Sequence, residues 1–125
     1  MPPRIIVADD YPGMIGAIRR LLTPDCDIVD AVMDGEALIE SAARLNPDVV
    51  VADLNLPFVN GLDACRRIRQ ANPAIKVVIF TALADEAIRE EVLAAGAAAF
   101  IPKQGIGTEL ISAIKTAYAD ARRQL

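Results

Sequence analysis

An unbroken apolar run that ends in an aspartate constrains the fold of this chain more than any other feature. Residues 48–52 read Asp-Val-Val-Val-Ala, and Asp53 follows, ahead of a loop that contains Pro57 and Gly61. β-Branched residues without polar alternation are typical of a strand buried on both faces, as in a parallel sheet. Because ligands bind at the carboxyl edge of open α/β sheets, Asp53 occupies a position where chemistry is expected.

Strand-like and helix-like segments alternate along the chain, which predicts a single domain over residues 1–125. Strands are expected at residues 4–8, 26–32, 48–52, 75–80 and 98–101, each followed by a helix with apolar residues three and four positions apart. The predicted fold is a doubly wound α/β domain with a five-stranded parallel sheet and five helices. Right-handed crossovers then bring the carboxyl ends of all the strands to one edge of the sheet.

Local signals mark where several of these helices begin and end. Asp34, Asp85 and Thr108 are expected to cap helix N-termini, and Pro12 is expected in the first turn of the first helix. Gly96 is expected to end the fourth helix in a left-handed conformation.

Composition excludes several classes of function. The chain has no histidine, which removes the usual transition-metal ligand and general base and leaves hard cations held by oxygen. The net charge of −4 argues against direct binding of nucleic acid. Cys26 and Cys65 are expected to be buried thiols rather than a disulfide or a metal site. We expect no membrane span and a cytoplasmic location, since no apolar stretch approaches the length of a bilayer-crossing helix.

Polar residues follow four of the five predicted strands. Asp9 and Asp10 follow the first strand, and Asp53, Thr81 and Lys103 follow the third, fourth and fifth. Carboxylates that lie close together raise one another's pKa unless a cation compensates, and Mg²⁺ is a suitable cation for oxygen ligands. A carboxylate can also attack a phosphoryl group, with an ammonium and a hydroxyl stabilising the transferred oxygens. The sequence therefore suggests Mg²⁺-assisted phosphorylation of an aspartate.

These motifs together resemble the receiver domains of two-component response regulators, which have the flavodoxin-like fold of CheY. The resemblance covers essentially the whole chain. It is carried by Asp9-Asp10, Asp53-Leu54-Asn55-Leu56-Pro57 with Gly61, Thr81-Ala82, and Lys103 behind Ala95-Gly96-Ala97.

The resemblance implies a role for each site residue. Asp53 would be the phosphoacceptor, and Thr81 and Lys103 would contact the phosphoryl group. The implied Mg²⁺ ligands are Asp53, Asp10, the backbone carbonyl of Asn55 and, through water, Asp9. Thr81 and Phe100 would form the switch, with Phe100 filling space as Thr81 moves toward the acyl phosphate. The domain would then catalyse only its own phosphorylation and dephosphorylation.

The resemblance also implies partners. A sensor histidine kinase or phosphotransfer protein would supply the phosphoryl group and select the chain mainly through the first helix, residues 14–22, and its neighbouring loops. Phosphorylation would change the surface of the fourth helix, fifth strand and fifth helix, where Ile106, Leu110 and the Ala-rich fourth helix could form an apolar dimer or output interface. The segment after Lys103, Gln104-Gly105, resembles receivers that precede LuxR-type helix-turn-helix domains.

The sequence departs from the receiver pattern at one position, and three other functional classes are alternatives to a receiver. Many receivers carry proline directly after the lysine, whereas Pro102 precedes Lys103 here, so the shape of that loop is open. A phosphohydrolase of the haloacid-dehalogenase type would need a second acid at position 55, where this chain has Asn55. An unphosphorylated pseudo-receiver would not need the acidic pair, threonine and lysine. A dinucleotide-binding Rossmann domain would need a glycine fingerprint after the first strand.

Overall fold

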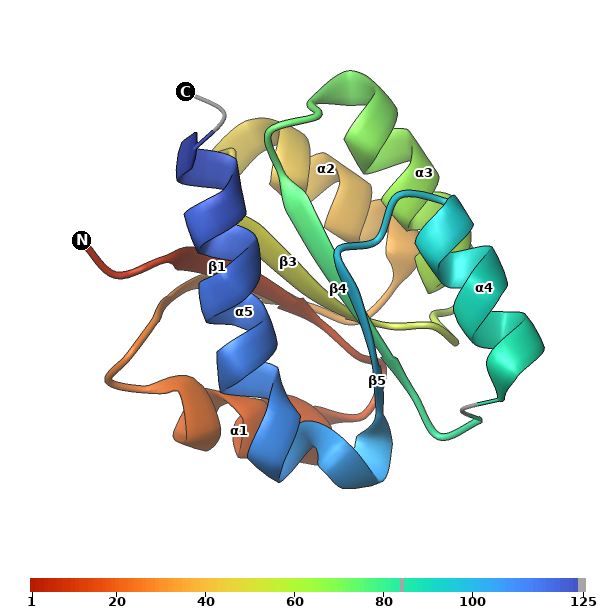
Figure 1. Cartoon of the computed structure of the whole chain (residues 1–125), viewed down its shortest axis with the longest axis horizontal. Helices are drawn as coiled ribbons and strands as arrows, with labels where there is room; N and C mark the ends of the chain where they lie inside the picture. The colour runs from red at the N-terminus through yellow and green to blue at the C-terminus, as the bar shows by residue number, and fades with distance from the viewer. Residues whose placement is uncertain (84, 124–125) are drawn as a thin grey trace.

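Parallel strands form one sheet in the order β2-β1-β3-β4-β5, with helices on both faces (Figure 1). The computed structural model describes residues 1–83 and 85–123. Within them the strands are β1 (Arg4–Ala8), β2 (Asp27–Val32), β3 (Val49–Asp53), β4 (Lys76–Thr81) and β5 (Ala99–Pro102). The helices are α1 (Pro12–Leu22), α2 (Gly35–Leu45), α3 (Gly61–Ala71), α4 (Glu86–Ala94) and α5 (Ile106–Arg123). The predicted fold class is confirmed.

The strands begin and end within one residue of the predicted positions. The sheet continues far enough to include two of the polar residues that were expected to follow it. Asp53 pairs with Phe80, and Thr81 pairs with Pro102. The candidate site residues Asp53 and Thr81 are therefore held by the ladder itself and not by a loose loop.

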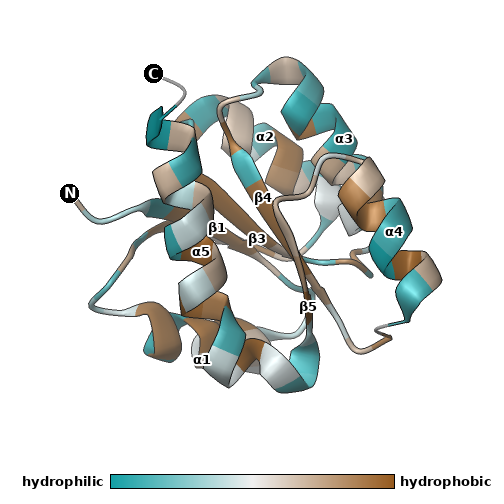
Figure 2. Cartoon of the chain, viewed as in Figure 1, coloured by the Kyte–Doolittle hydropathy of each residue, from teal (hydrophilic) through white to brown (hydrophobic). Residues whose placement is uncertain are grey.

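Strand side chains alternate between two apolar cores, one on each face of the sheet. On one face α2, α3 and α4 pack against Ile6, Val50 and Ile79 and their neighbours. On the other, α1 and α5 pack against Val7, Val51 and their neighbours. Apolar colour is concentrated on the strands in Figure 2, while the helices carry hydrophilic residues as well. Among residues 1–83 and 85–123, none of the helices combines the length and apolar character needed to cross a bilayer.

Two predicted N-caps are confirmed and one is wrong. Asp34 accepts a 2.8 Å hydrogen bond from the Ala37 N–H, and Asp85 accepts one of 2.9 Å from the Ile88 N–H. Thr108 does not cap α5, because a 3₁₀ turn over Lys103–Gly105 runs directly into the helix at Ile106. Thr108 lies inside the first turn of α5, where its hydroxyl donates to the Gly105 carbonyl at 3.3 Å.

The predicted helix terminator is also confirmed. Gly96 has φ +103°, a conformation that glycine adopts without steric cost. The sequence reading missed the cap of α3, where Asn60 accepts a 2.9 Å hydrogen bond from the Asp63 N–H. The Pro12 prediction holds, since this residue begins α1.

Candidate functional site: the acidic carboxyl edge

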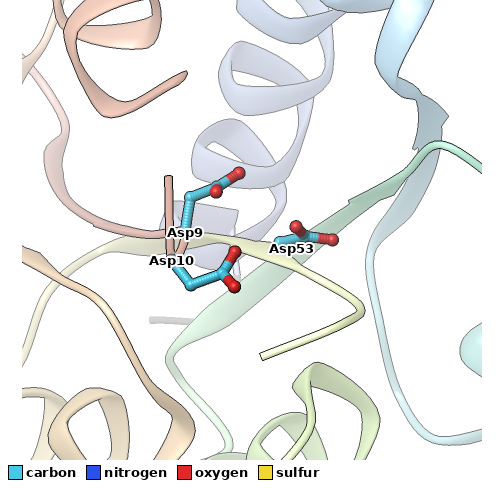
Figure 3. Close-up of side chains that lie close together, drawn as sticks. All are labelled: Asp9, Asp10 and Asp53. Atoms are coloured by element: carbon cyan, nitrogen blue, oxygen red, sulfur yellow. The ribbon is translucent and has the colours of Figure 1, made fainter. Parts of the chain in front are cut away.

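Three carboxylates meet where β1 and β3 end (Figure 3). The two strands pair in parallel with Ala8 opposite Ala52, so the next residues, Asp9 and Asp53, lie side by side. One carboxylate oxygen from each of Asp9, Asp10 and Asp53 lies within 4.8 Å of the others. The sheet register therefore builds the acidic cluster that the sequence predicted.

The three acids differ in exposure and in their hydrogen bonds. Asp9 is fully buried and Asp53 is 3% exposed, whereas Asp10 is exposed. Asp9 Oδ1 accepts the Tyr11 N–H at 2.8 Å, and Asp53 Oδ1 accepts the Asn55 N–H at 3.1 Å. Asp9 Oδ2 is buried without a hydrogen-bond partner. The buried pair thus keeps oxygens that the surrounding backbone does not satisfy.

Lys103 supplies positive charge to this pair. Its Nζ lies 3.1 Å from Asp53 Oδ2 and 3.7 Å from Asp9 Oδ2, and 5.7 Å from the centre of the Phe80 ring. Burial alone would lower the pKa of Lys103, but the hydrogen bond and charge of Asp53, together with Asp9, outweigh it and raise that pKa. Lys103 is therefore held as the charged ammonium, and the 3₁₀ turn that begins with it fixes the loop that the sequence left open.

The pKa of Asp9 is raised above its ordinary value. Burial is the largest cause, and the charges of Asp53 and Asp10 add to it. The Tyr11 N–H and Lys103 oppose the rise. The direction agrees with the carboxylate repulsion expected from the sequence, but the main cause is loss of water and not repulsion.

The donor set fits a hard divalent cation. The clustered ligand atoms are all carboxylate oxygens, and Asp9 has a buried oxygen, Oδ2, without a hydrogen-bond partner. Mg²⁺ takes a few carboxylates and keeps waters and phosphate oxygens in its remaining positions. Exposed Asp10 leaves one side of the cluster open to such ligands.

The two switch candidates lie on neighbouring strands. Thr81 is fully buried at the end of β4, and its Oγ1 accepts the Leu83 N–H at 3.1 Å. Phe100 on β5 pairs with Ile79 and is 8% exposed, within the core that α2, α3 and α4 cover. Asn55 is exposed just beyond Asp53, beside the cluster.

The prediction that Ile106 and Leu110 lie on the surface formed by α4, β5 and α5 is wrong. Ile106 is 8% exposed and Leu110 is fully buried, because both face the core beneath α5. That surface instead has a hollow of about 470 Å³ whose lining includes Arg89, Phe100 and Glu109. Arg89 and Glu109 give this hollow its charged groups.

Comparison with known proteins identifies the family. The model for the response regulator receiver domain matches residues 5–115. The chain belongs to that family. It is 33% identical over 114 residues to the transcriptional regulatory protein DegU of Brevibacillus brevis, covering 90% of this chain and 48% of that protein. The receiver domain thus spans about half the length of this curated relative.

Other relatives show how varied the proteins with such receivers are. A protein-glutamate methylesterase/protein-glutamine glutaminase of Rhodospirillum centenum is 36% identical over 118 residues, covering 90% of this chain and 29% of that protein. Among solved structures, a LuxR-family two-component response regulator from Aurantimonas sp. SI85-9A1 superposes with a TM-score of 0.90 and 32% identity. That match covers 96% of this receiver and 87% of the solved chain.

Sequence reasoning missed several contacts that shape the site. Thr81 Oγ1 accepts a hydrogen bond from the Leu83 N–H, and Asp9 Oδ1 accepts one from the Tyr11 N–H. Lys103 lies over the ring of Phe80. The backbone donors could be found only from the turn geometry, since any residue except proline provides an N–H. Phe80 lies in the predicted strand over residues 75–80, but nothing in its spacing indicates that its ring lies near Lys103.

Proposed function

We propose that Asp53 of this receiver domain accepts a phosphoryl group and that the acyl phosphate changes the surface at α4, β5 and α5. The observation that supports this most is the position of Lys103 Nζ, 3.1 Å from a carboxylate that is 3% exposed. A buried carboxylate with an ammonium beside it can become an acyl phosphate whose extra negative charge already has a partner.

The chemistry at Asp53 is a displacement at phosphorus. A carboxylate oxygen forms a bond to phosphorus while the bond from phosphorus to the donor atom breaks, and the leaving group keeps that electron pair and takes a proton from water. Lys103 then donates to a phosphoryl oxygen, and Thr81 donates its hydroxyl proton to another. Asp9, Asp10, Asp53 and the Asn55 carbonyl would hold Mg²⁺, which supplies charge neutralisation during transfer.

The proposed switch follows from the donors that the phosphoryl group needs. Thr81 is buried and now accepts from Leu83, so moving toward the acyl phosphate reorganises the loop after β4. Phe100, on the adjacent strand, would fill the space that Thr81 leaves. A phosphoryl group shifts this equilibrium only by binding one arrangement more tightly than the other.

Partners and output belong to the same proposal. The donor is a sensor histidine kinase or phosphotransfer protein, and we expect the exchange to take place in the cytoplasm. DegU is described as a transcriptional regulator and the Aurantimonas protein as LuxR-family, so we propose that this receiver controls transcription through another domain or protein. A homodimer through α4, β5 and α5 is proposed as the phosphorylated form.

We also propose that the domain turns over no substrate other than its own phosphoryl group. The position two residues after Asp53 is Asn55, which cannot act as the general acid of a phosphohydrolase. Incubation with acetyl phosphate and Mg²⁺ should therefore label the chain once and release phosphate slowly. Rapid turnover of an added phosphate monoester such as p-nitrophenyl phosphate would contradict the switch and favour a phosphatase.

A further inference from the structure

The junctions that lead from helix to strand before β3 and β4 carry the same dipeptide. Asn46-Pro47 follows α2, and Asn72-Pro73 follows α3. Because β3 and β4 are neighbouring parallel strands, the two asparagines meet at the amino edge of the sheet, opposite the acidic cluster. Asn72 Nδ2 lies 3.4 Å from Asn46 Oδ1, which is longer than the usual N–H···O hydrogen bond. The two amides therefore hold each other only weakly.

A hollow of about 250 Å³ lies beside these asparagines, between α2 and α3. The two helices pack side by side on one face of the sheet (Figure 1). The walls of the hollow are apolar, with short alanine side chains that leave the space open, and consist of Ile39, Ala42, Ala43, Ile68, Ala71 and Ile75. An apolar cavity of about 150 Å³ holds a benzene ring, so this hollow has room for a ring with a short substituent.

The polar side chains at the hollow include a cation and no acid. They belong to Asn46, Arg67 and Asn72. Arg67 is exposed, and its side chain forms no ion pair within the part of the chain that the structure describes. Its neighbour Arg66, by contrast, is paired with Asp63 at 3.2 Å. An unpaired guanidinium beside an apolar hollow is complementary to an apolar molecule that ends in an anion.

The backbone around the hollow does not need these polar side chains as donors. Arg4 Nη1 donates to the Leu45 and Asn46 carbonyls, at 2.9 Å each, and so satisfies the end of α2. Asn72 Oδ1 accepts the Ala74 N–H at 3.1 Å, which uses the oxygen of that amide and not its Nδ2. The Nδ2 groups of Asn46 and Asn72 therefore remain to donate to a ligand.

We infer that the hollow between α2 and α3 binds a small carboxylate with an apolar body, such as an aryl-substituted short-chain acid. The apolar body lies against Ile39, Ile68 and Ile75, and the carboxylate accepts hydrogen bonds from Arg67 and from the two asparagine amides. A neutral ligand of the same shape leaves the charge of Arg67 without a partner, and a small anion such as acetate leaves the apolar walls in water. The inference is independent of the proposed phosphorylation, because the hollow lies at the edge of the sheet opposite the acidic cluster.

Amide NMR titration tests the site with three probes. Cinnamate has the ring and the carboxylate, cinnamyl alcohol has the ring without the charge, and acetate has the charge without the ring. Cinnamate is expected to bind with a Kd of about 1 mM or tighter, a modest affinity for a ligand of its size. Its shifts should fall on residues 39–46 and 67–75. Cinnamyl alcohol and acetate should each bind about tenfold more weakly, the scale of one lost hydrogen bond to a charged group or of lost apolar burial.

Two variants change the hollow in different ways, and a third is the control. Arg67→Gln removes the charge and should weaken cinnamate by about tenfold while leaving cinnamyl alcohol within about twofold of wild type. Ala71→Leu places a larger side chain at the exposed end of α3 and should abolish the shifts caused by both ring-bearing probes. Arg66→Gln removes the neighbouring arginine, which does not line the hollow, and should bind all three probes like wild type.

Equal affinity for cinnamate and cinnamyl alcohol would overturn the inference, because the hollow would then not recognise a carboxylate. Equal weakening by Arg66→Gln and Arg67→Gln would also overturn it, since only the overall charge of the chain would matter. Cinnamate that gives no saturable shift, or shifts only in other parts of the chain, would reject the site. None of these outcomes bears on Asp53, whose phosphorylation is tested separately with acetyl phosphate.

Discussion

Lys103 Nζ lies 3.1 Å from Asp53 Oδ2, although Asp53 ends β3 and Lys103 begins the 3₁₀ turn that follows β5. The contact links the end of β3 to the start of the turn that leads into α5. A change of charge at Asp53 therefore acts directly on Lys103, the first residue of the 3₁₀ turn that leads into α5. This link provides one physical route from the candidate phosphorylation site to the proposed output surface.

Removal of Asp10 should impair Mg²⁺ binding more than removal of Asp9. Asp10 is exposed and open to an incoming ion, whereas Asp9 is buried and already engaged by the Tyr11 N–H and Lys103. Asp9→Asn is expected to weaken binding by about tenfold, the scale of an outer-shell group, and Asp10→Asn by more. Isothermal titration with MgCl₂ measures both, and an Asp10→Asn variant that binds like wild type would reject this ligand assignment.

Loss of the Thr81 hydroxyl should separate phosphorylation from switching. Thr81→Ala keeps Asp53 and Lys103, so it should still accept a phosphoryl group, but no hydroxyl can follow it. In wild type the Leu83 amide donates to Thr81 Oγ1, so its NMR shift reports directly on movement of that hydroxyl. Addition of beryllofluoride and Mg²⁺ should shift amides across residues 85–118 in wild type and much less in Thr81→Ala. The same shifts in both proteins would rule out coupling through Thr81.

Gly61 is needed for space beside Asp53. A Cβ at Gly61 would lie 2.3 Å from the Asp53 carbonyl oxygen, whereas one at Gly107 on α5 would meet nothing within 4 Å. Gly61→Ala should lower the free energy of unfolding by about 1–3 kcal/mol through overpacking and should slow labelling by acetyl phosphate. Gly107→Ala is the control and should raise stability by up to about 1 kcal/mol. Urea denaturation measures both, and equal effects would contradict the steric account.

The strands and helix caps show how much of the fold could be predicted from the sequence. The strands, the order of polar residues at their ends and the Asp34 and Asp85 caps follow from local patterns, because each depends on neighbours in the chain. The Thr108 cap was wrong because the turn after Pro102 continues into α5 without interruption. Phe58 has φ +67°, and its neighbours Pro57 and Val59 lie against Gly35, the first residue of α2. No local pattern in the sequence reports such contacts.

The features of the candidate site also divide into those that the sequence predicts and those that need the structure. The roles of Asp53, Thr81 and Lys103 came from resemblance to the family and remain predictions, while the parallel register accounts for the closeness of Asp9 and Asp53. The misplacement of Ile106 and Leu110 on a surface has a simple cause. Helical spacing identifies an apolar face, but it does not say that this face of α5 meets the sheet and not the solvent.

The cysteines should be inert in the folded protein. Burial raises the pKa of the Cys65 thiol to about 11 from an ordinary value of 9.0, and it also raises that of Cys26. Alkylation by iodoacetamide at pH 8 should run about a hundredfold slower than for an exposed thiol and should become fast in urea. Rapid labelling of the native protein would contradict burial of the thiols.

The same shift predicts an alkaline loss of stability. The protonated thiol is favoured by the fold, so the contribution of Cys65 is complete below pH 9.0 and is lost as pH rises through about 11. Cys65→Ala should lack this part of the alkaline decline while losing some core packing at every pH.

Phosphorylation of Asp53 is the central claim, and peptide mapping tests it most directly. Wild-type protein treated with acetyl phosphate and Mg²⁺ should gain the mass of one phosphoryl group, located by tandem mass spectrometry in the peptide that contains Asp53. Asp53→Asn keeps the shape of the side chain but removes the nucleophilic oxygen pair, so it should gain nothing under the same conditions. Asp48→Asn, at the opposite end of β3, should label like wild type. Undiminished labelling of Asp53→Asn, with the phosphoryl group on another aspartate, would contradict the account.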